Sequence, residues 1–281
     1  MIRTFFIAAL LVLATLIGIP LQWLSIKLGL PMRRLIPMYY HRLCLKLFGV
    51  RVEVRGAPTK DRPLLFIANH SSWLDHLILS GTTPVVFIAK KEIASWPVFG
   101  LLAKLQRSVF VDRERRHKTG AVTQEISTRL TGGDPVVLYG EGTTGDGNRV
   151  LPFRSALLGA MSMTVGPGEN GYLQPVSIAY TKLQGLPMGR QHRPVAAWFG
   201  DTNIIKHIGR VLRIGGIDAV VTFGPAMVVT PEMDRKNVAR VLEQSVRRMT
   251  SAARLARPEI AISHNALEIS PGAVSLPAES R

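Results

Sequence analysis

The 281-residue sequence predicts one α/β domain with a mixed, mostly parallel sheet flanked by helices, preceded by an N-terminal membrane-anchoring helical segment. Short apolar runs alternate with amphipathic stretches of helical period, and this alternation is typical of a largely parallel sheet. A stretch without charged residues, 4–26, precedes them. The predicted organisation is membrane-anchoring helices in 1–49, the α/β domain in 50–256 and a disordered tail, with three prolines and no periodicity, in 257–281.

The uncharged stretch 4–26 is long enough to cross the hydrocarbon core of a bilayer as a helix. A signal peptide is one alternative, but no A-x-A-like cleavage site follows and the apolar run continues past Pro20. A buried core helix is another. Because proline interrupts helices, a re-entrant or interfacial helix is the alternative to a spanning one.

Basic residues follow this stretch and indicate how the chain meets a membrane. Residues 32–49 alternate basic and apolar groups at helical spacing, which predicts a second helix lying in the interface. The positive-inside tendency then places the domain on the cytoplasmic face of the inner (cell) membrane. The net formal charge of +16 favours an anionic partner, and an anionic membrane surface accounts for much of it.

Each predicted strand is a short run bounded by turn residues. The run 50–56 alternates apolar and polar residues, whereas 63–69, 84–90 and 136–140 are continuously apolar, as expected of buried strands. The remaining predicted strands are shorter or carry a proline; they are 108–113, 173–181, 195–199 and 218–227.

Each predicted helix has an apolar face that recurs every three to four residues. The predicted helices are 70–80, 96–105, 118–131, 154–163, 203–213 and 231–256. The last of them starts at Pro231, which suits the first turn of a helix. The single cysteine, Cys44, is predicted to be a buried apolar side chain, which excludes an intrachain disulfide.

The segment Asn69–Asp75 carries the candidate catalytic chemistry, directly after a predicted buried strand. A neutral imidazole such as that of His70 accepts a proton from a hydroxyl when a carboxylate holds its other nitrogen. Positions five apart point about 140° apart on a continuous helix. We therefore expect His70 in the loop and Asp75 in the first helical turn, reaching back. The alternative is that Ser72 and Asp75 form a capping box without catalytic meaning.

Four blocks in order resemble the glycerolipid acyltransferase family, of the lysophosphatidic acid acyltransferase (PlsC-like) type. The first is the His-x4-Asp block in 69–75, and the second ends at Asp112-Arg113. The third is the Glu-Gly-Thr block at 141–143, and the fourth is the strand with a proline, 173–176. The resemblance covers about 65–180, and the apolar N-terminus also fits.

The resemblance implies that His70 is the general base and that Asp75 orients it. It also implies a substrate-binding set: Arg113, Glu141, Gly142, Thr143 and Pro175. The hydroxyl of a lysolipid would attack an acyl thioester directly, without an acyl-enzyme. The donor would be acyl carrier protein or a coenzyme A thioester, and neither a cofactor nor a metal site is expected. Each of the two charged residues in that set also has a purely structural interpretation. Arg113 would then be one of a run of solvated basic residues, and Glu141 a carboxylate at the start of a helix.

One departure bears on the acceptor. Phosphate-handling members commonly carry a basic residue after Glu-Gly-Thr, where this sequence has Thr144. The longer string 141–157 resembles the branch that acylates lyso-ornithine lipid, although Arg149 or Arg154 is a candidate for the missing charge. Both 1-acylglycerol-3-phosphate and lyso-ornithine lipid therefore stay open as acceptors, with glycerol 3-phosphate as a further candidate.

Two other functional classes compete with an enzyme. A nucleic-acid-binding protein would explain the positive charge, but aromatic residues make up 7% and no recognised nucleic-acid module is present. A non-catalytic membrane adaptor is the second class, and we expect such a relative to have lost His70 or Asp75. The prediction is therefore an enzyme of lipid biosynthesis that binds no nucleic acid.

Overall fold

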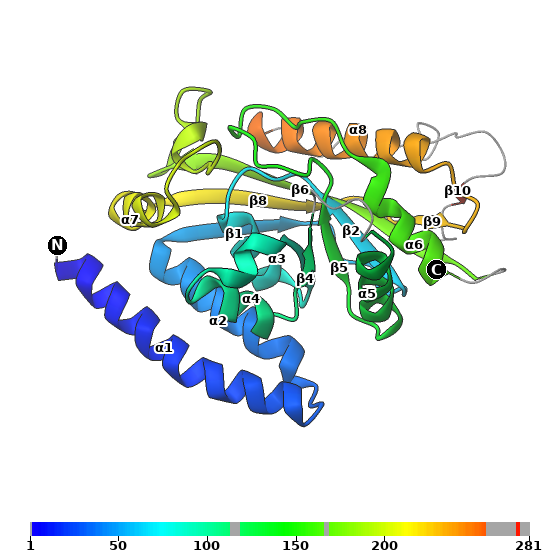
Figure 1. Cartoon of the computed structure of the whole chain (residues 1–281). Helices are drawn as coiled ribbons and strands as arrows, with labels where there is room; N and C mark the ends of the chain where they lie inside the picture. Colours follow the sequence, from blue (N-terminus) through cyan, green and yellow to red (C-terminus); the bar gives the residue numbers. More distant parts are fainter. Residues whose placement is uncertain (1, 113–118, 166–168, 257–273, 276–281) are drawn as a thin grey trace.

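Helices cover both faces of one twisted sheet in the computed structural model, which describes residues 2–112, 119–165, 169–256 and 274–275 (Figure 1). The order of the main strands is β1-β8-β6-β2-β5-β3-β4. The strands are β1 (Val50–Arg55), β2 (Leu64–Ala68), β3 (Val86–Lys90), β4 (Val109–Val111), β5 (Val136–Tyr139), β6 (Gly171–Leu183), β7 (Leu186–Pro187), β8 (Ile217–Phe223), β9 (Met227–Val229) and β10 (Val274–Ser275).

Strand β2 lies at the centre of the sheet and is parallel to both of its neighbours, β6 and β5. The pairs β3–β5, β3–β4 and β1–β8 are parallel as well, while β8 is antiparallel to β6. The expected mixed, mostly parallel sheet is confirmed. All five residues of β2 are buried, which explains why its sequence is continuously apolar.

The helices divide between two cores, one on each face of the sheet. Phe66 of β2 belongs to the core under α2, α3 and α7, whereas Leu65 and Ile67 belong to the core under α5, α6 and α8. The helices are α1 (Ile2–Lys27), α2 (Met32–Phe48), α3 (Leu74–Thr82), α4 (Phe99–Leu105), α5 (Thr119–Thr131), α6 (Gly159–Thr164), α7 (Ile204–Ile214) and α8 (Arg235–Arg254).

Several predicted elements differ from the structure, three of them in the C-terminal half of the domain. The strand predicted at 195–199 is wrong: Arg193–Val195 form a 3-10 turn, in which Ala196 and Ala197 donate to Arg193 O. The strand predicted at 218–227 is divided, because it leaves the ladder at Gly224 and continues as β9. The last helix begins at Arg235 rather than Pro231, since the carboxylate of Asp234 caps it.

Helix α1 is uninterrupted through Pro20 and contacts the domain along much of its length. Thr15 hydrogen-bonds to the Tyr40 hydroxyl of α2 at 2.7 Å, and the Gln22 amide donates to Leu105 O of α4 at 2.8 Å. The stretch Thr4–Lys27 has the length and hydropathy of a membrane span, and 6% of its most apolar window is buried. Most of its apolar surface therefore faces outward.

Helix α2 is attached by the buried carboxylate of Asp134, at the start of β5. Arg34 of α2 donates to Asp134 Oδ1 at 2.7 Å, and Arg107 forms a bidentate pair with the same carboxylate. The predicted tail, 257–281, lies outside the described residues except for Val274–Ser275, which pair with Val228 and Val229 of β9.

Candidate active site

The loop between β2 and α3 holds the predicted catalytic pair at the carboxyl end of the central strand. Asn69 fixes the exit of β2, because its side-chain amide donates to Ile178 O and accepts from Ile178 N at 2.9 and 2.8 Å. His70 follows in the loop, and Asp75 lies in the first turn of α3. This is the placement that the spacing of the two residues predicts.

Four donors converge on the fully buried carboxylate of Asp75. Oδ2 accepts from His70 Nδ1 at 2.9 Å and from the backbone of Ser71 and Ser72 at 2.7 and 2.9 Å. Oδ1 accepts from the Tyr180 hydroxyl at 2.6 Å. The backbone bonds are those of a helix cap, so capping and orientation of the imidazole belong to one carboxylate.

The surroundings of His70 determine which of its nitrogens can act as a base. Because Asp75 only accepts hydrogen bonds when ionised, Nδ1 of a neutral imidazole carries the proton and Nε2 keeps its lone pair. The ring is stacked on Tyr139, with centroids 3.9 Å apart, and 13% of the side chain is exposed. His76 approaches it edge-on, and burial lowers the pKa of His76 to about 3, so His76 is neutral.

Glu141 connects the loop of the third block to His70. Its Oε1 accepts from the backbone N–H of His70 at 3.0 Å, while Oε2 is buried without a hydrogen-bond partner among the described residues. Burial raises the pKa of Glu141 to about 8, although backbone N–H groups of His70 and Leu151 act in the opposite direction. A protonated Oε2 would be a donor beside the reacting groups.

The other predicted substrate-binding residues lie in three different segments of the chain. Gly142 has φ +68°, a left-handed conformation that favours glycine, and the Arg154 side chain lies against it. Thr143 is exposed on the same loop. Pro175 is buried in β6 opposite Ile67, and its ring lies beside Gly224. Arg113 lies outside the described residues. For these four residues, substrate binding stays a prediction.

Three aromatic contacts of the loop were not predicted. Tyr180 and Tyr139 reach Asp75 and His70 from β6 and β5, and Trp198 N donates to Ser71 O at 2.7 Å. Tyr180 lies 105 residues from Asp75 in the chain, and only the pairing of β2 with β6 brings them together. The sequence carries no local signal for such contacts, since the aromatic residues read as ordinary strand residues.

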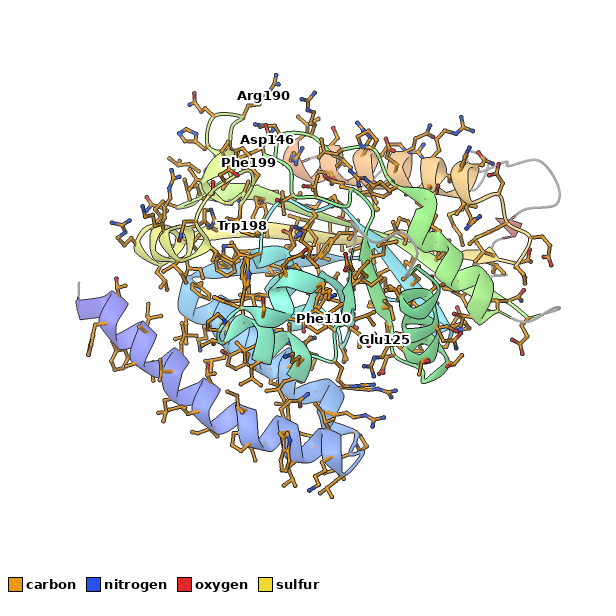
Figure 2. All side chains as sticks on the ribbon, viewed as in Figure 1. Phe110, Glu125, Asp146, Arg190, Trp198 and Phe199 are labelled. Carbon is orange, nitrogen blue, oxygen red and sulfur yellow. The ribbon has the colours of Figure 1, made fainter. Side chains whose placement is uncertain are left out.

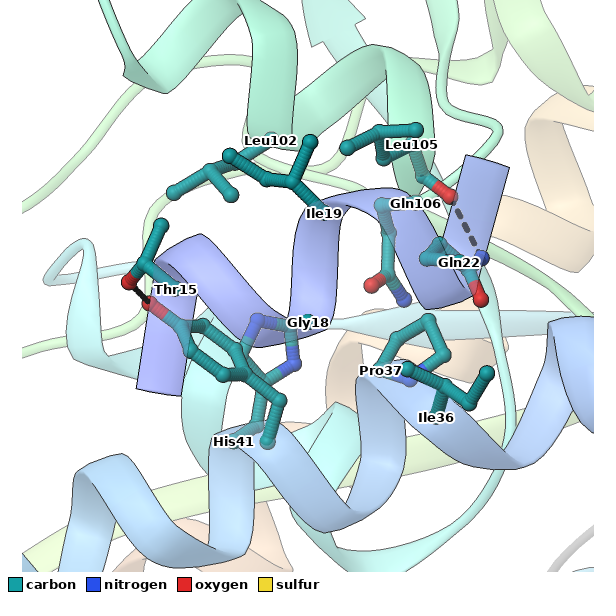
Figure 3. Close-up of a pocket in the computed structure, with 11 residues that line it drawn as sticks. Thr15, Gly18, Ile19, Gln22, Ile36, Pro37, His41, Leu102, Leu105 and Gln106 are labelled. Atoms are coloured by element: carbon teal, nitrogen blue, oxygen red, sulfur yellow. Dashed lines mark hydrogen bonds between the residues drawn. The ribbon is translucent and has the colours of Figure 1, made fainter. Parts of the chain in front are cut away.

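A mostly apolar cavity lies between α1, α2 and α4, on the side of the sheet that carries the dyad (Figure 3). Gly18, Ile19, Leu102 and Leu105 contribute to its wall, with His41 of α2 beside them. His41 is near enough to His76 to lower the pKa of that residue, and His76 in turn contacts His70. The residues that line the cavity come from α1, α2 and α4 and do not include His70 or Asp75.

The arrangement places a potential base, His70 Nε2, where it can accept the proton of a hydroxyl. No group of three or more histidine, cysteine or carboxylate side chains suited to a metal is found within the described part of the chain. What the site offers is a base held by a buried carboxylate, beside a second buried carboxyl group.

Known proteins with similar sequences share one description. Residues 51–179 match the family model described as Acyltransferase. Over 259 residues the chain is 46% identical to the lyso-ornithine lipid O-acyltransferase of Brucella abortus (strain 2308), covering 91% of this chain and 97% of that protein. It is 45% identical to the lyso-ornithine lipid O-acyltransferase of Rhizobium meliloti (strain 1021), covering 89% and 86%.

Two further likenesses are more limited. The chain is 38% identical to the 1-acyl-sn-glycerol-3-phosphate acyltransferase of Neisseria gonorrhoeae over 114 residues, which covers 40% of this chain and 45% of that protein. The crystal structure of the 1-acyl-sn-glycerophosphate acyltransferase PlsC from Thermotoga maritima superposes with a TM-score of 0.59. At 20% identity, over 89% of this chain and 92% of that one, this second likeness concerns the fold.

Proposed function

Because the chain belongs to the acyltransferase family, we propose that it transfers a fatty acyl group from a thioester donor to the hydroxyl of lyso-ornithine lipid. The observation that carries this acceptor is the identity of 46% and 45%, over nearly the whole chain, with two lyso-ornithine lipid O-acyltransferases. Thr144, where phosphate-handling members commonly carry a basic residue, agrees with an acceptor that lacks a phosphate.

The proposed reaction follows from the hydrogen bonds of the dyad. Nε2 of His70 takes the proton of the acceptor hydroxyl while the oxygen attacks the thioester carbonyl carbon. Asp75 stabilises the imidazolium that forms. The carbon–sulfur bond then breaks, and the leaving thiolate takes the proton back from His70. In the complete reaction one ester bond is formed and one thioester bond is broken. Acyl thioesters of acyl carrier protein and of coenzyme A are both suitable donors.

Lysophosphatidate is the second candidate acceptor. It is favoured by the 38% identity with the Neisseria enzyme, which is confined to 114 residues. It is also favoured by the exposed side chain of Arg154 beside Gly142, since a guanidinium suits a phosphate. The shorter span of this likeness is the reason why we place lysophosphatidate second.

We further propose that α1 lies in one leaflet of the membrane instead of crossing it. The contacts of Thr15 and Gln22 with α2 and α4 keep the helix alongside the domain, which a perpendicular span would not permit. Its exposed residues, such as Phe5, Leu16 and Trp23, would enter the acyl chains. The basic residues of α2 favour the cytoplasmic face.

The cavity beside α1 is the proposed site for the far end of an acyl chain. It is mostly apolar, it lies on the side of the sheet that carries the dyad, and a membrane-facing helix forms part of its wall.

The test is an acyl-transfer assay with the purified full-length protein in lipid vesicles. Lyso-ornithine lipid and lysophosphatidate are each offered with acyl carrier protein and coenzyme A donors. His70→Ala serves as the blank, and His192→Ala, at an exposed histidine, serves as the matched control. Turnover of lyso-ornithine lipid that is lost only in His70→Ala supports the proposal. Turnover of lysophosphatidate alone would replace the acceptor, and turnover of neither would overturn the function.

A further inference from the structure

Helix α7 presents a basic and apolar face that no described element covers. Its buried residues His207, Val211 and Leu212 face the core, whereas Ile205, Lys206, Arg210 and Arg213 are exposed on the opposite side. Ile205 is 63% exposed. We propose that this face of α7, together with the adjoining Phe199, is a second membrane-contact surface, whose partner is the anionic headgroup layer of a bilayer.

Charge and hydrophobicity on this face fit that partner. No described carboxylate forms an ion pair with Lys206, Arg210 or Arg213. Exposed basic side chains next to an inserted apolar residue are the pattern of helices that lie in a membrane interface. Gly209 lies on the same face, and a side chain at its position would meet no atom within 4 Å. The surface at Gly209 is therefore open.

Helix α7 packs into the same core cluster as the N-terminal part of α1. This cluster contains Ile7 of α1 with Val211 and Leu212 of α7. Trp198 and Phe199 lie at the end of the molecule where α7 is found (Figure 2). Phe199 is 36% exposed. The inference rests on the membrane association proposed above.

Two hydrogen bonds connect this surface to the catalytic loop. Trp73, which precedes α3, donates from Nε1 to His207 Nδ1 of α7 at 2.9 Å. Trp198 donates its backbone N–H to Ser71 O, next to His70, at 2.7 Å. A bilayer that contacts α7 and Phe199 would thus be held at a fixed height relative to His70. That geometry suits an acceptor whose hydroxyl lies near the headgroups.

A local probe tests the contact independently of α1. The native Cys44 is buried, so a thiol-reactive fluorophore such as NBD can be placed selectively on Ile205→Cys in the full-length protein. On vesicles of phosphatidylcholine with phosphatidylglycerol, we expect its emission to shift to shorter wavelength and to be quenched by spin-labelled lipid. The matched probe on Gln244→Cys, exposed on α8 across the sheet, should not respond. An unresponsive probe at position 205, on protein that sediments with the vesicles, overturns the proposal.

Charge reversal tests the choice of partner. We expect Lys206→Glu, Arg210→Glu and Arg213→Glu together to lower partition onto anionic vesicles by about tenfold or more, because each basic residue adds to the attraction. The same change at Lys236, Arg240 and Arg248, exposed on α8, is the matched control. Equal losses in both triple variants would show a net-charge effect and contradict a specific surface. Acyl transfer to lysolipid in detergent micelles, measured alongside, separates failure of this surface from failure of the proposed function.

Discussion

The Tyr180 hydroxyl donates a 2.6 Å hydrogen bond to Asp75 Oδ1, the carboxylate oxygen that His70 does not use. Burial and the charge of Asp75 raise the pKa of Tyr180 well above 10, so the hydroxyl stays protonated and remains a donor. The bond prevents rotation of the carboxylate and thereby fixes the direction of His70. In the proposed mechanism Tyr180 is therefore a positioning residue for His70 and Asp75, and it comes from a strand distant in sequence.

Tyr180→Phe should reduce kcat by about 10- to 100-fold with little change in KM, because one hydrogen bond to a charged group is lost. The ring and its packing are kept, so the fold should survive. Tyr172→Phe, on the same strand, is the matched control and should leave kcat unchanged. The measurement is the steady-state kcat and KM of both variants with the preferred acceptor. Equal kcat values for Tyr180→Phe and Tyr172→Phe would show that the Tyr180 hydroxyl has no role in the reaction.

Asp75→Asn should lower kcat by about a thousandfold, less than the complete loss expected for His70→Ala, because an amide no longer fixes the required tautomer. It should also cost about 1 kcal/mol of stability, since the cap of α3 is weakened. A melting curve separates the two effects. If the Asp75→Asn variant is folded and keeps most of its activity, Asp75 only caps α3 and does not orient His70.

The central strands and the dyad could be predicted from sequence because their signals are local. Leu64–Ala68 is a continuous apolar run, and the spacing of His70 and Asp75 places one in a loop and the other in the next helix. The strand predicted at 195–199 was wrong for a related reason. Ala196 and Ala197 are buried outside the sheet, and the backbone N–H of Trp198 donates to Ser71 O. A local apolar pattern indicates that a segment is buried, but it does not indicate which other segment it packs against.

Contacts between residues far apart in the sequence could not be predicted from local sequence patterns. Nothing in the sequence near Asp134 indicates that Arg34 and Arg107 will meet it. The same holds for Glu141, whose bond to the His70 backbone depends on the pairing of β2 with β5. The four-block resemblance predicts Glu141 as a site residue, but its raised pKa follows from burial and could not be predicted without the packing.

Glu141→Gln should alter the pH dependence of stability. The folded-state pKa is about 8, above the ordinary value of 4.5. Between these values the folded protein keeps a proton that the unfolded chain has released, so stability falls as pH rises through this window and is unaffected by this group below it. Glutamine does not titrate. The melting temperature of Glu141→Gln relative to wild type should therefore increase from pH 5 to pH 8.5, with surface Glu232→Gln as the control; a constant difference would contradict the shift.

Asp134→Ala should destabilise the protein by about 3–5 kcal/mol, because Arg107 is left buried without its counter-charge. Asp218→Ala breaks the exposed pair with Arg51 and should cost about 0–1 kcal/mol. Thermal unfolding of both variants in the same detergent provides the comparison. Similar melting temperatures for the two variants would show that Asp134 does not hold α2 against the domain.

Gly18→Leu should shorten the acyl chains that the enzyme accepts. Gly18 contributes to the wall of the cavity between α1, α2 and α4, and a side chain at this position has free space of more than 4 Å around its Cβ. Leucine would occupy volume proposed for the end of the chain, so turnover of the longest donors should fall by about tenfold or more while shorter donors are kept. Leucine also favours the helix more than glycine does, which excludes unwinding of α1 as the cause of such a loss. Ala9→Leu, on the exposed side of α1, is the matched control. A uniform loss across all chain lengths would mean that the cavity does not hold the acyl chain.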